Sequence, residues 1–181
     1  TIPNGVTLEV PDGVTLTITE TLTIEGTLTI EGTLISYGTL TKSGNGSITN
    51  DGTIYSLQDL NDGTGSAFGL TAGANNFFPD DNNKFVVSTN FPTTLDIDYT
   101  IPNGVTLEVP DGVTLTIEGT LTIEGTLISN GTLAKSGSGS ITNNGTIYAN
   151  NDLNDGTGSA FGLTAGANII YPDANNKFVV G

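Results

Sequence analysis

Apolar and polar residues alternate in short segments along much of the chain. In residues 21–36 the segments Thr-Leu-Thr-Ile, Thr-Leu-Thr-Ile and Thr-Leu-Ile-Ser begin six residues apart, with a Glu-Gly pair between them. In the first two segments Leu and Ile occupy every second position, so they lie on one face of an extended segment and Thr lies on the other. No stretch of ~10 residues has the helical period. The pattern therefore predicts an all-β fold of short strands.

The parity of these faces indicates how consecutive strands are connected. If Glu25-Gly26 were a two-residue hairpin turn, Ile24 would pair with Thr27, and the apolar and polar faces would mix. A three-residue loop pairs Ile24 with Leu28, but it leaves very short strands and a sheet with one bare apolar face. In a parallel β-solenoid each strand stacks on the equivalent strand of the next coil, ~4.8 Å away, and the apolar face points into a closed core. We therefore predict a parallel β-solenoid.

The chain contains one module almost twice. Residues 1–18 recur without a mismatch at residues 100–117, and residues 25–87 recur at residues 118–180 with 11 differences in 63 positions. Each copy also contains the shorter six-residue repeat. A repeat within a repeat is typical of solenoids, which gain length by stacking equivalent units.

The duplication also predicts where the modules begin and end. We place a first β-solenoid module at residues 1–87, a connecting strand at residues 88–99 and a second β-solenoid module at residues 100–181. The first copy holds one additional six-residue unit, residues 19–24. Such an insertion is expected if whole strands are added to a continuous wall. The expected architecture is a solenoid of two tandem, near-identical modules.

The start of the second module carries a resemblance. Residues 99–113, Tyr-Thr-Ile-Pro-Asn-Gly-Val-Thr-Leu-Glu-Val-Pro-Asp-Gly-Val, are followed by Glu-Gly-Thr-Leu units. This string resembles the opening coils of right-handed parallel β-helices in bacterial and archaeal cell-surface and adhesin-like proteins. The resemblance implies a right-handed β-helix. It is less specific for function, because that family includes adhesins, sheath or filament proteins and polysaccharide-processing enzymes.

The chain is strongly acidic. Its formal net charge is −15, from 19 acidic residues against four lysines, Lys42, Lys84, Lys135 and Lys177, and it has no arginine. Phosphate binding needs clustered cations, so we exclude nucleic acid as a partner. No apolar run approaches the ~20 residues of a transmembrane helix, so we predict no membrane insertion.

Few side chains are suited to catalysis. The chain has no His, Cys or Arg, and so lacks the usual proton shuttle, thiolate nucleophile and guanidinium clamp. Pairs such as Asp96/Asp98 or Asp80/Asp81 could act like the two acids of a glycoside hydrolase. Adjacent acids on a loop are more often solvated surface, and the lack of Trp counts against sugar stacking. We predict that the protein is not an enzyme.

Calcium is the one candidate cofactor. Asp-Leu-Asn-Asp-Gly occurs at residues 59–63 and again at residues 152–156, and places oxygen ligands on a turn. The candidate ligands are Asp59, Asn61, Asp62, Asp152, Asn154 and Asp155. The fifth position is Gly63, where the EF-hand pattern needs an oxygen ligand. A turn stabilised by Asx hydrogen bonds explains the same residues and is favoured.

Rows of threonine suggest a further function. Thr-x-Thr units resemble the ranks of Thr on ice-binding solenoids; they occur at residues 15–17, 21–23, 27–29, 114–116 and 120–122. In a three-sided coil, units six residues apart fall on different walls, which argues against a flat ice-binding face. Outward-facing β-branched residues are the simpler interpretation.

Three Asn-x-Ser/Thr sequons are candidate glycosylation sites. They begin at Asn45, Asn130 and Asn144, and none is matched at the equivalent position of the other copy. Chance in a chain rich in Asn, Gly and Thr accounts for them, although an extracellular surface would be open to the modification.

The ends of the sequence suggest assembly. The repeat begins at once, and no polar cap follows the last strand segment. An uncapped solenoid end exposes strand edges and core, which favours stacking of a second copy. The candidate assembly residues are Thr1, Ile2, Val6, Leu8, Val10, Phe178, Val179 and Val180. The alternative is that the chain belongs to a longer array whose caps lie elsewhere.

These observations give an expected function. We expect an extracellular structural protein that assembles head to tail with itself into a filament, sheath or surface fibre, through uncapped ends or exchange of a terminal strand. The cell surface or a matrix polysaccharide is a candidate second partner. The absence of an initial Met is consistent with removal of a signal peptide, and hence with an extracellular or cell-surface location. The alternative is a monomeric stalk or binding segment of an adhesin.

Overall fold

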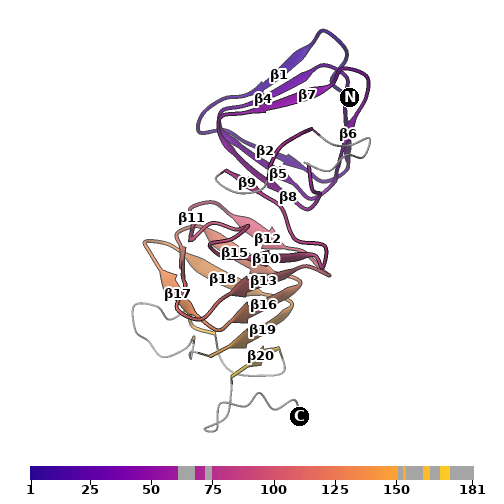
Figure 1. The fold of residues 1–181 in the computed structure, drawn as a ribbon. Coiled ribbons are helices and arrows are strands. Elements are labelled where there is room, and N and C mark those ends of the chain that lie inside the picture. Colours follow the sequence, from indigo (N-terminus) through magenta and orange to yellow (C-terminus); the bar gives the residue numbers. More distant parts are fainter. Residues whose placement is uncertain (61–67, 72–74, 151–152, 154–160, 164–167, 172–181) are drawn as a thin grey trace. The chain divides into compact units, whose positions relative to one another are not determined.

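The protein is an all-β solenoid. A computed structural model describes residues 1–60, 68–71, 75–150, 153, 161–163 and 168–171 (Figure 1). The regular elements in these residues are β-strands, and every pair of them is parallel. The predicted β-solenoid is therefore confirmed. The chain divides into two compact units, Thr1–Asp80 and Asp81–Gly181, which we call the first and second unit.

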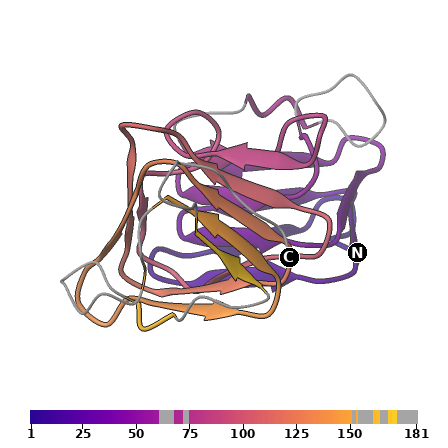
Figure 2. The same cartoon turned by 90° about the horizontal axis from the view of Figure 1, so that it is seen from below.

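The first unit has three walls. Its strands are β1 (Thr7–Val10), β2 (Thr15–Ile18), β3 (Thr21–Ile24), β4 (Thr27–Ile30), β5 (Thr33–Ser36), β6 (Thr39–Lys42), β7 (Ser47–Asn50), β8 (Thr53–Ser56) and β9 (Asn76–Phe77). The sheets have the strand orders β1-β4-β7, β2-β5-β8-β9 and β3-β6. Three consecutive strands thus belong to three different sheets, and the path of the chain around the interior can be followed in Figure 1 for this unit and in Figure 2 for the second unit.

The second unit repeats this plan. Its strands are β10 (Lys84–Val86), β11 (Thr94–Leu95), β12 (Tyr99–Ile101), β13 (Thr106–Val109), β14 (Thr114–Ile117), β15 (Thr120–Ile123), β16 (Thr126–Ser129), β17 (Thr132–Lys135), β18 (Ser140–Asn143), β19 (Thr146–Ala149) and β20 (Ile169–Ile170). The sheets have the orders β10-β13-β16-β19-β20, β11-β14-β17 and β12-β15-β18. β10, β11 and β12 form the first coil of this unit. That coil uses residues that the sequence assigned to the end of the first module, to the connecting strand and to the start of the second module.

The coils stack in register. Thr7 lies opposite Thr27, and Thr27 lies opposite Ser47, which gives a repeat of 20 residues per coil on this wall. In the same sheet Leu28 lies opposite Ile48. Leu28 is completely buried in the core of the unit. The stacking of apolar side chains along each wall is what the alternating pattern predicted.

The additional six-residue unit at residues 19–24 changes which strands are neighbours. It supplies β3, a complete side of the first coil, so β1 pairs with β4. In the second unit β13, which has the same sequence as β1, pairs with β16. The sequence counterpart of β16 in the first copy is β5, and β5 pairs with β2. One inserted strand therefore shifts the residues after it by one wall relative to the residues before it.

Close contact between coils constrains the corners. A Cβ atom on Gly139 would overlap the carbonyl oxygen of Ile117 in the preceding coil. The Gly139 N–H donates to the carbonyl of Ser136 at 3.0 Å, which holds the corner in place. The backbones approach too closely here for any side chain.

We predict that Gly139→Ala lowers the free energy of unfolding by ~2–3 kcal/mol, because the added methyl group meets a backbone atom that cannot move without displacing a coil. Ser138→Ala is the matched control, since Ser138 is exposed at the neighbouring position. It should change stability by less than ~0.5 kcal/mol. Chemical denaturation followed by circular dichroism measures both variants; equal midpoints would contradict the close approach at this corner.

Candidate functional site

The first coil of the first unit exposes apolar side chains. β1 is an edge strand of the sheet β1-β4-β7 in the described part of the chain. Val6 and Val14 are each 47% exposed and Leu8 is 39% exposed. In the second copy, the equivalent Val105 is 7% exposed and Leu107 is completely buried. Because the two segments have the same sequence, the difference comes from their neighbours and not from their residues.

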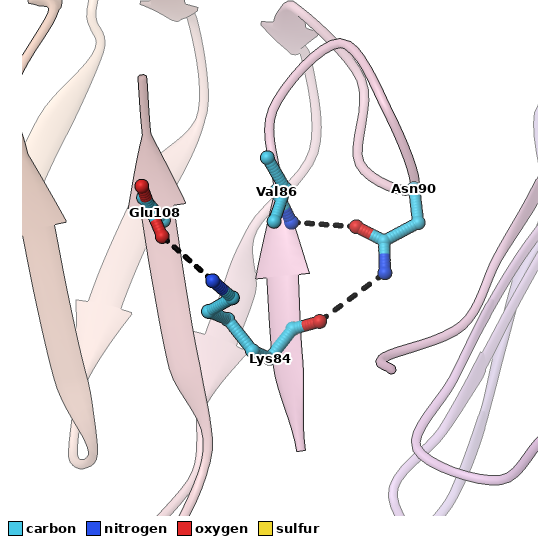
Figure 3. A network of polar contacts seen from close by, with 4 residues as sticks. All are labelled: Lys84, Val86, Asn90 and Glu108. Atoms are coloured by element: carbon cyan, nitrogen blue, oxygen red, sulfur yellow. Dashed lines mark hydrogen bonds and ion pairs between the residues drawn. The ribbon is translucent and has the colours of Figure 1, made fainter. Parts of the chain in front are cut away.

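β10 is the strand that covers β13. Phe85 lies opposite Leu107, and both side chains are completely buried. The Val87 N–H donates to the carbonyl of Glu108 at 2.9 Å. The Lys84 ammonium group pairs with the Glu108 carboxylate at 2.9 Å on the outer face (Figure 3). Backbone bonds, an apolar contact and an ion pair therefore hold the same strand pair together.

Aromatic side chains fill the interior of the coil that β10, β11 and β12 form. The ring centroids of Phe85 and Phe91 are 5.3 Å apart, those of Phe91 and Tyr99 5.6 Å, and those of Phe85 and Tyr99 6.4 Å. All three pairs have edge-to-face geometry, which suits aromatic rings in a closed core. The second unit thus begins with a well-filled coil.

Asn90 closes the outer edge of β10. In a parallel ladder the backbone groups of alternate residues point to opposite edges. Val87 bonds to β13, so the N–H of Val86 and the carbonyl of Lys84 point away from it. The Val86 N–H donates to Asn90 Oδ1, and Asn90 Nδ2 donates to the Lys84 carbonyl at 3.2 Å (Figure 3). The side-chain amide therefore takes the place that a peptide group of a further strand would occupy.

The sequence did not reveal this role of Asn90. It lies in a turn within the segment that we interpreted as a connecting strand. The turn is tight: Ser88 has a φ of 70°, and its N–H donates to the carbonyl of Phe91 at 2.9 Å. A Ser-Thr-Asn segment indicates a turn. Nothing in the pattern indicates which strand edge the Asn side chain will reach.

The candidate assembly residues have different positions. Thr1 is exposed, but Ile2 and Val10 are buried, and Ile2 forms a β-bridge with Ile24. Val6 and Leu8 lie on the exposed edge of the first coil. Phe178, Val179 and Val180 lie outside the described residues. Val14, which is as exposed as Val6, was not among the candidates. The sequence around it is the same as around its second-copy counterpart Val113, so only the structure reveals its exposure.

The calcium candidates are placed only in part. Asp59 is described and exposed, whereas the five other candidates, Asn61, Asp62, Asp152, Asn154 and Asp155, lie outside the described residues. Among the residues that are described, no three His, Cys, Asp or Glu side chains gather as a metal site would require.

The carboxylates considered for catalysis are on the surface. Asp80, Asp81 and Asp96 are exposed. Asp98 is also exposed, and its Oδ1 accepts a hydrogen bond from the Thr120 N–H at 2.7 Å. That bond caps the start of β15, which is a structural role for this carboxylate.

The sequons differ in exposure. Asn45 and Asn144 are exposed, and Asn130 is half-buried. Asn45 also lines a polar hollow of about 360 Å³ together with Asn4, Glu25, Ser43 and Gly44. A single carboxylate in a polar hollow does not define a reaction or a ligand.

Comparison with models of protein families, with curated proteins and with solved structures found no match to this chain. The described residues include no helix long and apolar enough to cross a bilayer.

The candidate site with the most structural support is the edge of the first coil of the first unit, because the molecule contains both an open and a covered version of it.

We predict that Asn90→Ala lowers the free energy of unfolding by about 1–2 kcal/mol, because it removes the hydrogen bonds of the Asn90 amide to the Val86 N–H and to the Lys84 carbonyl. Asn90→Asp keeps an acceptor and loses the donor, so it should lower the free energy of unfolding by less. Asn150→Ala is the control: its side chain donates to the Asn130 carbonyl at 3.3 Å from an exposed position. Thermal unfolding measures the series, and an unchanged Asn90→Ala protein would show that the edge of β10 needs no closure.

Proposed function

We propose that this protein is an extracellular structural protein that assembles end to end with further copies of itself into a filament, sheath or surface fibre. The observation that carries the proposal is the exposed first coil. Val6, Leu8 and Val14 are the large hydrophobic side chains that are exposed among the described residues. An open strand edge beside exposed apolar side chains is a template for pairing with another chain.

The mechanism would be β-augmentation of β1. A strand added to its outer edge supplies backbone hydrogen bonds, and alternate side chains supply specificity. The covered β13 shows what such an addition achieves in this sequence, because Leu107 is completely buried there. A head-to-tail contact of this kind does not close on itself unless its rotation closes a ring, so it generates open filaments.

The net charge affects how this assembly would proceed. Each chain carries a formal charge of −15, so copies repel one another at low ionic strength. Salt screens that repulsion over a Debye length of ~10 Å at 0.1 M. Assembly should therefore accelerate as NaCl is added, until screening also weakens any ion pairs at the interface.

A monomeric stalk or binding segment of an adhesin is the second candidate. The closed outer edge of β10 supports it, because blocking an edge is a common way to prevent strand addition. Asn90 gives the second unit such a block. In this alternative the exposed coil would be covered by something other than a further copy.

Electron microscopy and sedimentation velocity of the purified chain distinguish these functions. We predict uniform, unbranched filaments at high concentration, and fewer of them for Val6→Glu, which places a charge on the exposed first coil. Thr49→Glu makes the same charge change at an exposed position on β7. It should assemble like the original chain, with circular dichroism confirming that both variants fold. Monomers at every concentration and ionic strength would overturn the proposal in favour of the stalk.

A further inference from the structure

We propose that the outer edge of β1 binds residues 177–180, Lys-Phe-Val-Val, of a second copy as an added parallel strand. The inference rests on the proposed self-assembly and specifies its donor, its acceptor and their register. The acceptor is the exposed edge strand β1 in the first unit. The donor is a sequence segment that occurs twice in the chain.

Both halves of the contact are duplicated in the sequence. Residues 84–87 and residues 177–180 are both Lys-Phe-Val-Val, and Asn-Asn precedes each of them. The acceptor segment, residues 100–117, is identical to residues 1–18. Within the described residues these partners meet once, where β10 pairs with β13. The second donor and the second acceptor therefore have the same sequences as a strand pair whose geometry the structure describes.

The β10–β13 pair fixes the expected register. Lys84 lies opposite Thr106, Phe85 opposite Leu107 and Val86 opposite Glu108. By equivalence, Lys177 would lie opposite Thr7, Phe178 opposite Leu8 and Val179 opposite Glu9. The exposed Leu8 would then be covered by a phenylalanine, as Leu107 is covered by Phe85.

Backbone bonds would follow the same pattern. The Thr106 N–H donates to the carbonyl of Asn83 at 3.0 Å, and the Val87 N–H donates to the carbonyl of Glu108 at 2.9 Å. The equivalent bonds would join Thr7 to Asn176 and Glu9 to Val180. A shift by one residue would turn the phenylalanine away from Leu8, so the apolar contact and the ladder favour the same register.

The ion pair adds charge specificity. Lys84 and Glu108 are 2.9 Å apart, with side chains 33% and 26% exposed. The equivalent pair is Lys177 with Glu9. Two of the four lysines in the chain belong to the Lys-Phe-Val-Val segments. Because the chain has so few cations, the lysine distinguishes the Lys-Phe-Val-Val strand from most other segments of the chain.

Exchange of the two charges tests the contact in the full-length chain. We expect Glu9→Lys and Lys177→Glu each to weaken assembly about tenfold or more in low salt, since each places like charges together. An equimolar mixture of the two variants should assemble again, because each then presents the opposite charge to the other. Glu31→Lys and Lys135→Glu carry the same charge changes at exposed positions elsewhere and should assemble normally. Assembly that is indifferent to Glu9 and Lys177, or that the mixture does not restore, would overturn this contact and leave the proposed function standing.

A synthetic peptide separates the two proposals. The peptide of residues 172–181, carrying a fluorophore, should bind the full-length chain in dilute solution and raise its fluorescence anisotropy. Binding should fall at least tenfold with Glu9→Lys and recover when the peptide carries Lys177→Glu. Binding without filaments would support the strand contact and overturn the polymer. Failure of the original peptide to bind would overturn the inference, whether the edge is already covered by the chain's own segment or rejects the strand.

Discussion

The ladder of parallel backbone hydrogen bonds between successive coils is the interaction on which the rest of this structure depends. Each strand has two edges, and the ladder is complete only where both have a partner. The same stacking covers the inward side chains, because those of each coil pack against those of the coils next to it. A first coil is therefore deficient in two ways, in backbone partners and in apolar contacts. Leu8 is 39% exposed and Leu107 is completely buried, although the sequences of the two segments are identical.

The two units treat this deficiency differently. In the second unit, β10 covers β13, and aromatic rings fill the interior. The amide of Asn90 hydrogen-bonds to the backbone on the outer edge of β10. A side-chain amide can do this because it presents a donor and an acceptor side by side, as a peptide group does. In the first unit the equivalent edge of β1 has no strand on it among the described residues. The contrast within one chain is the reason to regard that edge as a binding surface.

Much of the fold could be predicted from the sequence. Alternation of Leu and Ile with Thr gave strands, and the parity of their faces excluded hairpins, since Ile24 cannot pair with Thr27 without mixing those faces. The neighbours of each strand were harder to predict, because one inserted unit at residues 19–24 moves β1 from one partner to another. The role of Asn90 could not be predicted, since it depends on a turn that brings one side chain to one edge. The exposure of Val6 and Leu8 depends on what lies beside them, and identical local sequence carries no information about that.

Hydrogen exchange measured by mass spectrometry tests the central claim most directly, because β1 and β13 differ in their neighbours and not in their sequence. Peptides that extend past Ile18 or Ile117 are distinguishable, since Thr-Glu follows the first and Glu-Gly follows the second. In dilute solution the account predicts faster exchange for the amides of β1 than for those of β13. At concentrations where the protein assembles, exchange in β1 should slow toward that of β13. Equal protection of the two strands in dilute solution, or no change in β1 on assembly, would contradict the account.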